Sequence, residues 1–200
     1  MLLQMVGPRR GCDMEDKMGL DPAKGDALVL VDGLDRMVGE TTKERAHREG
    51  LLHRAFSIVL TRENADGDVE ICLAQRALSK YHSPGLWANS CCSHPRAGDE
   101  LVDACFRRLG EELGCSAKYL TEIGSFVYRA EFSDGLVEYE YDHVFVGEIE
   151  GVPQPDPNEV EQVRWVSADG VARELVDCPE HFCVWAFTVL SLALAFIEHA

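Results

Sequence analysis

The sequence predicts a single α+β domain in which a mixed β-sheet lies between helices. Apolar segments of strand length follow one another in runs, with few helical segments between them, and this order is typical of the class. A chain of 200 residues is about one domain long and can bury a core without disulfides or a structural metal. Hydrophobic residues make up 46% and charged residues 27%, the balance of an ordinary globular protein.

The elements begin after a leader. Residues 1–25 show no hydrophobic periodicity, so we expect a disordered or loosely attached leader there and one domain over 26–200. The apolar run at 27–32 predicts a buried strand that the Asp32-Gly33 turn closes. The polar segment 43–50 is either a helix or a loop.

A hairpin and a short strand follow. Apolar runs at 55–60 and 69–76 flank an Asp66-Gly67 turn, which predicts two antiparallel strands. A polar loop at 78–85 leads into a short strand at 86–92.

One helix is well marked, at residues 99–114. Asp99 can cap its first turn, and Gly114 is placed to end it. Apolar side chains recur at helical spacing and predict one buried face, which carries Leu101, Val102, Cys105, Leu109 and Leu113.

Three strands and two helices complete the expected order. The strands cover about 123–130, 136–148 and 160–166, with a proline-rich loop around 153–157. The apolar stretch at 182–197 is 16 residues long, shorter than the roughly 20 that span a bilayer. It predicts a buried or interface helix, so we expect no membrane span.

Composition excludes some partners and favours a compartment. With 35 acidic and 19 basic residues the net charge is −16, which argues against nucleic acid and anionic membranes as partners. A small anionic ligand stays compatible, because a pocket can be locally basic. Eight cysteines without a C-x-x-C pair, and no charged segment before an apolar one at the N-terminus, favour a reduced, cytoplasmic protein.

Histidines and carboxylates supply candidate metal ligands. Glu138 and Glu140 are two apart in a strand, so both side chains lie on one face. Together with His47, His53 and His94 they form a ligand set that suits Zn, Mn, Fe or Mg. The alternative is that the two glutamates face solvent.

A cysteine pair precedes one of these histidines. Cys92 and His94 share a face of an extended segment, and Cys91 points the other way. Cys92 is therefore a candidate acid or base beside a metal-bound histidine. Two other interpretations stay open, namely a pair of small core residues and a zinc-binding Cys–His pair.

Charged residues surround these elements. Glu111 and Glu112 end the predicted helix, where the helix dipole disfavours them, so either one binds a divalent metal or both lie on a solvated face. Arg76, Lys80 and Arg107–Arg108 supply cations of the kind that a diphosphate needs. The sequence has no Walker A motif and no G-x-G-x-x-G.

Four segments in this order resemble the type 1 isopentenyl-diphosphate isomerase family. They are AHREGLLHRAFS (46–57), QRALSKYHSPGLWANSCCSHP (75–95), RRLGEELG (107–114) and FVYRAEFSDGLVEYEYDHVF (126–145). The resemblance covers residues 27–190 and implies a Nudix-type α/β/α sandwich. It also implies that the protein interconverts isopentenyl and dimethylallyl diphosphate through a tertiary carbocation, acting as a monomer or homodimer.

The resemblance assigns roles residue by residue. Cys92 and Glu140 match the catalytic pair on opposite faces of the five-carbon chain, and Tyr128 matches a tyrosine that hydrogen-bonds near the glutamate. A divalent metal (Mn²⁺, Zn²⁺ or Mg²⁺) would be held by His47, His53, His94, Glu138 and Glu140. Glu112 matches a residue that helps to bind a second ion, Mg²⁺, on the diphosphate. The diphosphate contacts would be Lys43, Arg76, Lys80, Ser93 and Arg108.

Aromatic side chains are needed to stabilise the cation. Trp87 and Tyr128 are candidates by location. The family's cation-stacking tryptophan follows a proline, whereas Glu180 follows Pro179 here, so Phe182 or Trp185 would have to replace it.

Two rival functions stay open. The first is a Nudix diphosphate hydrolase, which needs a metal-binding glutamate where this chain has Arg108; the isomerase family shares that substitution. The second is a catalytically inactive metal-binding module of the same fold.

Overall fold

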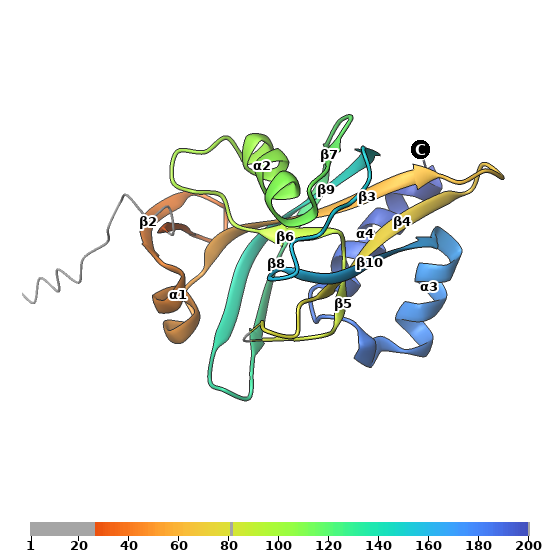
Figure 1. Cartoon of the computed structure of the whole chain (residues 1–200). Coiled ribbons are helices and arrows are strands. Elements are labelled where there is room, and N and C mark those ends of the chain that lie inside the picture. The colour runs from red at the N-terminus through yellow and green to blue at the C-terminus, as the bar shows by residue number, and fades with distance from the viewer. Residues whose placement is uncertain (1–26, 81, 200) are drawn as a thin grey trace, which may run out of the picture.

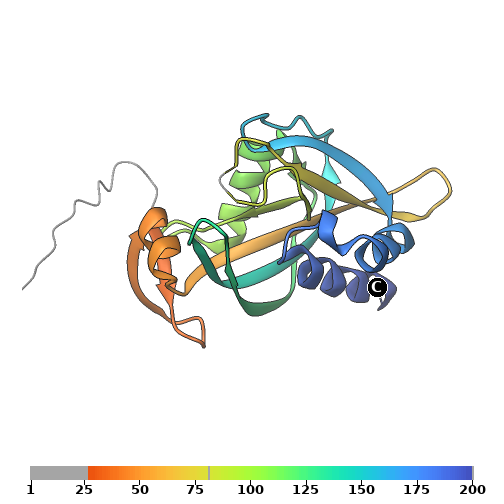
Figure 2. The ribbon, with the colours of Figure 1, turned by 90° about the horizontal axis from the view of Figure 1, so that it is seen from below.

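The computed structural model describes residues 27–80 and 82–199, and the predicted leader at 1–25 lies outside them (Figure 1). A mixed sheet lies between helix α2 (Leu101–Leu113) on one face and helices α3 (Ala168–Asp177) and α4 (Ala186–His199) on the other (Figure 2). This three-layer arrangement confirms the predicted α+β sandwich.

Strand β3 (His53–Glu63) is the centre of the sheet. It pairs in parallel with β9 (Val137–Glu150), and this pairing makes the sheet mixed. Its other partners are antiparallel: β1 (Ala27–Val31), β4 (Val69–Arg76) and β6 (Cys91–Ser93). The outer strands are β5 (Trp87–Ala88) and β10 (Val160–Ser167) on β4, and β7 (Ser116–Ala117) and β8 (Thr121–Glu131) on β9. The predicted hairpin is β3–β4, and the predicted strand at 86–92 divides into β5 and β6.

One end of the domain is built by β1, β2 (Met37–Thr42) and α1 (Lys43–Glu49). The structure resolves the helix-or-loop alternative as a helix. The Thr42 hydroxyl accepts a hydrogen bond from the Arg45 N–H at its start, and Gly50 ends it in the left-handed conformation. The sequence analysis did not predict β2, because its side chains are mostly exposed and carry no apolar alternation.

Helix α2 covers one apolar cluster, where Cys105, Leu109 and Leu113 pack on Phe56 and Phe145 of the sheet. Two details of the prediction are wrong. Asp99 does not cap α2, because its carboxylate accepts a hydrogen bond from the Arg96 N–H and pairs with Arg107. The N-cap residue is Glu100, whose side chain makes no capping hydrogen bond. Val102 is 40% exposed, since it points away from the sheet.

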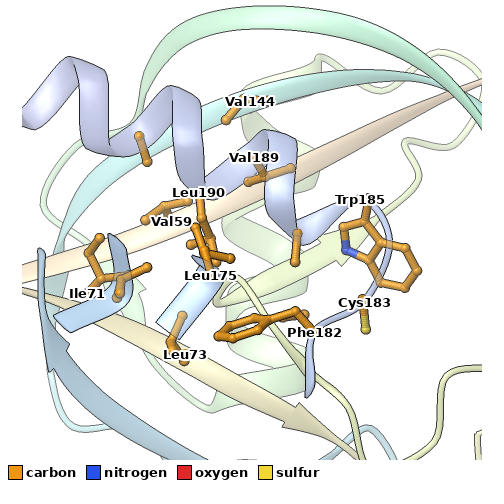
Figure 3. Packing of buried hydrophobic residues seen from close by; sticks show 14 of the residues in the cluster. Val59, Ile71, Leu73, Val144, Leu175, Phe182, Cys183, Trp185, Val189 and Leu190 are labelled. Atoms are coloured by element: carbon orange, nitrogen blue, oxygen red, sulfur yellow. The ribbon is translucent and has the colours of Figure 1, made fainter. Parts of the chain in front are cut away.

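The other face packs against α3 and α4, which the short 3₁₀ turn η2 (Pro179–His181) separates. Figure 3 shows Val189 and Leu190 of α4 against Val59, Ile71 and Val144 of the sheet. The apolar stretch at 182–197 starts before α4, and its first residues belong to the core. None of the helices in the described residues is long and apolar enough to span a membrane.

Candidate active site

A cavity opens beside β3 and is lined by the neighbouring strands, by α2 and by Trp185, which directly precedes α4. Eleven of the predicted site residues line it: Lys43, Arg76, Lys80, Cys92, Ser93, His94, Arg108, Glu112, Tyr128, Glu138 and Glu140. His47 and His53 lie behind His94, with ring centroids 6.2 and 5.0 Å from it. Trp87 lies outside the cavity lining, and its ring is covered by the Arg164 guanidinium at 4.2 Å.

Four side chains converge on one point: ligand atoms of His47, His53, His94 and Glu140 lie within 4.8 Å of one another. The parallel pairing of β3 with β9 sets His53 directly beside Glu140, and α1 supplies His47. His53 Nδ1 lies 2.8 Å from the Leu51 carbonyl, so in the neutral ring it carries the hydrogen. Nε2 then presents its lone pair to the cluster, and this buried atom has no hydrogen-bond partner.

The electrostatics of the cluster suit a cation. Burial lowers the pKa of His47 to about 3 and that of His94 to about 4, so both rings are neutral. Burial opposes ionisation of Glu140, but the hydrogen bond to His94 and the electrostatic effect of the neighbouring histidines outweigh it and hold the pKa of Glu140 well below its usual range. Neutral imidazoles and an ionised carboxylate fit a divalent metal.

Glu138 lies beside this cluster and has other partners. As the two-residue spacing predicts, it shares a face with Glu140, and both are buried rather than facing solvent, at 5% and 7% exposed. Its carboxylate lies 2.8 Å from His82 Nε2 and 3.1 Å from the Tyr128 hydroxyl, which is also 2.6 Å from Glu140. His82 was missed by the sequence analysis, because it stands alone in a polar loop without a motif.

Cys92 and Cys91 point to opposite faces, as predicted. Both line the cavity, but Cys91 also packs in the α2 cluster, whereas Cys92 packs against the cluster on the other face of the sheet. The Cys92 sulfur has three polar neighbours, at 3.1 Å (Asn89 Oδ1), 3.2 Å (Trp185 Nε1) and 3.5 Å (Ser57 Oγ). Burial raises the pKa of Cys92 above its usual range, so the group is a thiol at neutral pH.

Basic side chains also line the cavity. Arg108 pairs with Glu111 at 2.6 Å and with Glu112, and Lys80 pairs with Glu159. Glu112 is buried and raised in pKa by that burial, while the Glu111 side chain is 42% exposed. The two glutamates therefore differ: Glu111 lies on the solvated face of the helix, whereas the carboxylate of Glu112 faces inward.

The structure shows which aromatic side chain lies at the cavity, although Glu180 follows Pro179 where the resemblance would require a tryptophan. Glu180 is exposed on η2. Trp185 is 4% exposed and lines the cavity, with its ring centroid 6.4 Å from that of Tyr128. Phe182 packs in the core beneath it (Figure 3). Of the two candidates for the missing aromatic, Trp185 is therefore the one at the cavity.

The fold and its motifs define the chain as a NUDIX protein: the NUDIX domain family matches residues 51–184. Among solved structures, DR0079 from Deinococcus radiodurans superposes with a TM-score of 0.65 at 19% identity, covering 82% of this chain and 97% of that one. A MutT NUDIX hydrolase from Burkholderia pseudomallei gives 0.55 at 17% identity, covering 70% and 97%. These likenesses show the fold.

Closer relatives give the family. The chain is 45% identical over 163 residues to the isopentenyl-diphosphate Delta-isomerase of Serratia proteamaculans, covering 82% of this chain and 88% of the relative. It is 46% identical to the enzyme of that name from Photobacterium profundum, covering 84% and 93%. The chain belongs to the isopentenyl-diphosphate Delta-isomerase family.

Proposed function

We propose that this protein interconverts isopentenyl and dimethylallyl diphosphate, with Cys92 and Glu140 as the two groups that transfer protons. One group adds a proton to the alkene and gives a tertiary carbocation, and the other removes a proton from the neighbouring carbon. The atoms balance, because one proton enters and one leaves. The reverse reaction exchanges the two roles.

One observation carries this proposal: Cys92 and Glu140 enter the same cavity from strands on opposite edges of β3. Cys92 lies beside Ser57 in the β3–β6 pairing, and Glu140 lies beside His53 in the β3–β9 pairing. Paired residues point to the same face of a sheet, so both groups reach a ligand that lies across β3. This placement supports protonation and deprotonation from different sides.

The aromatic lining suits the intermediate. The Trp185 indole N–H touches the Cys92 sulfur, and the Tyr128 hydroxyl touches Glu140, so an aromatic ring accompanies each proton-transferring group. Aromatic faces attract a cation, and a site closed to water keeps the carbocation from being trapped. Because Trp87 lies outside the lining, we assign this role to Trp185 in its place.

Five polar side chains of the cavity would hold the diphosphate: Lys43, Arg76, Lys80, Ser93 and Arg108. Four of these side chains are cations in a protein of net charge −16, and cations of this kind bind a diphosphate. Binding energy from the diphosphate, remote from the reacting carbons, fixes the apolar tail between Cys92 and Glu140. Glu112, which is buried and pairs with Arg108, would share a Mg²⁺ ion with the diphosphate.

The histidine cluster would hold a divalent ion, Mn²⁺, Zn²⁺ or Mg²⁺, through His47, His53, His94 and Glu140. When bound, the ion supplies a positive charge that keeps the carboxylate ionised and in place. Glu138 lies outside the four converging residues, and we assign it to holding the Tyr128 hydroxyl.

The proposed site is complete in one chain, so it is compatible with a monomer or a homodimer. We place the enzyme in the cytoplasm. The seven cysteines that the described part of the chain contains are free, which supports a reducing compartment.

To test this, the metal-loaded protein is incubated with isopentenyl diphosphate and Mg²⁺, and the products are identified. The isomerase gives an acid-labile allylic product without phosphate, a hydrolase releases phosphate, and an inactive binding module gives neither. We expect Cys92→Ala and Glu140→Gln to abolish turnover in folded protein. Cys105→Ala is the matched control and should retain turnover, because that thiol lies in the α2 cluster and outside the cavity lining. Substantial activity in either of the first two variants would remove the assignment.

A further inference from the structure

The Asn89 side chain is locked in one orientation behind Cys92. Asn89 lies between β5 and β6 and is 1% exposed. Its amide nitrogen donates to the Ile58 carbonyl at 3.1 Å and to the Cys91 carbonyl at 3.0 Å, so both N–H groups are used. The flipped amide would set its oxygen against two carbonyl oxygens. The amide oxygen therefore has to face Cys92, whose sulfur lies 3.1 Å away.

The other polar neighbours of the sulfur leave the thiol hydrogen to Asn89. The Trp185 indole nitrogen at 3.2 Å is a donor and cannot accept. The Ser57 hydroxyl is farther away, at 3.5 Å, and lies 2.8 Å from the buried Asp142 carboxyl group. Asn89 is thus the nearest fixed acceptor for the S–H group.

We propose that Asn89 is a positioning residue that accepts the Cys92 S–H hydrogen bond and so fixes the catalytic sulfur at the cavity wall. This inference rests on the proposed role of Cys92 in proton transfer. A cysteine side chain has three staggered rotamers, and its thiol hydrogen rotates freely unless an acceptor fixes it. Proton transfer to or from carbon needs the sulfur in one place, and an acceptor held by two backbone bonds supplies that place.

Infrared spectroscopy tests this directly, because an S–H group that donates a hydrogen bond absorbs at a lower frequency than a free one. The Cys92 band is obtained as the difference between the wild-type protein and Cys92→Ala. We expect the wild-type band at the hydrogen-bonded position and a shift to higher frequency in Asn89→Ala. The matched control is Ser90→Ala, which removes a neighbouring, equally buried side chain that bonds the Leu60 N–H and the Cys72 carbonyl. It should leave the band unmoved.

Kinetics give a second readout. Asn89→Ala should lower kcat about three- to tenfold, the value of one ordinary hydrogen bond, with KM unchanged because the diphosphate contacts remain. A wild-type band at the free-thiol position, or an unmoved band in folded Asn89→Ala, overturns the inference. If Asn89→Ala does not fold, the wild-type band alone decides. A protein without isomerase activity would refute the proposed function, whereas the band would still report on the Asn89 contact.

Discussion

Replacing Tyr128 by phenylalanine removes one hydroxyl that two carboxylates share. Burial, reinforced by the charges of Glu140 and Glu138, raises the pKa of Tyr128 far above its usual value, so the hydroxyl keeps its hydrogen. That hydrogen is donated to Glu140 at 2.6 Å, and Glu138 lies at 3.1 Å. The substitution keeps the ring next to Trp185 and takes away only this bond.

The expected loss follows from the kind of bond. A hydrogen bond to a charged acceptor contributes about 1.5–3 kcal/mol. If Glu140 has to stay fixed through the proton transfer, Tyr128→Phe should lower kcat by roughly 10- to 150-fold. KM should change little, because the side chains proposed to bind the diphosphate are untouched.

Steady-state isomerisation kinetics measure this effect, with metal content measured on the same samples. Tyr141→Phe is the matched control, since Tyr141 follows Glu140 on β9 and lies on the opposite face of the sheet, with its hydroxyl 3.3 Å from Ser125. A kcat of Tyr128→Phe within twofold of the control would refute the reasoning, as it would show that Glu140 does not depend on this donor.

Three further predictions concern the histidines. His82→Ala removes the 2.8 Å contact to Glu138 and should lower kcat severalfold. Leu78→Ala is the control and should have no effect, because Leu78 is 70% exposed in the same loop. Equal kinetics of the two variants would contradict this prediction. His53→Asn should lose the bound divalent ion in elemental analysis, and unchanged metal content would exclude the cluster as its site. In metal-free protein, burial holds the pKa of His94 at about 4, so only the unfolded chain binds this proton below about pH 6.5. The unfolding free energy should therefore fall by about 1.4 kcal/mol per pH unit from pH 6.5 towards 4, and urea titrations should show a shallower slope for His94→Asn.

Local periodicity explains which elements were predictable. The strand expected at 69–76 has those bounds in the structure, because its apolar run ends at polar turns on both sides. Strand β2 lacks that signal: its side chains are mostly exposed, and its backbone bonds to β1 hold it in the sheet. The break between β5 and β6 arises from Asn89 and Ser90, whose side chains bond to backbone groups that are distant in sequence.

Some contacts of the site were likewise predictable from the sequence, and others were not. The spacing of Glu138 and Glu140, and that of Cys92 and His94, fixes which side chains share a face, so these juxtapositions follow from the sequence. The approach of His53 to Glu140 depends on the parallel pairing of two strands that are more than 80 residues apart. The contacts of His82 and Trp185 likewise depend on where a loop and a helix start come to lie. Tertiary packing decides such contacts, and short-range patterns carry no information on them.

Arg108 links the fold to the chemistry that we propose. A hydrolase of this fold needs a carboxylate at that position, so that metal-bound water can attack phosphorus. Here the Arg108 guanidinium lies against Glu111 and Glu112, so this part of α2 carries a cation instead of a third acid. A cation there attracts the diphosphate and lowers the negative charge available to a metal cluster. In the proposed mechanism the diphosphate is the anchor, and the reacting bond would lie at the other end of the substrate, between Cys92 and Glu140.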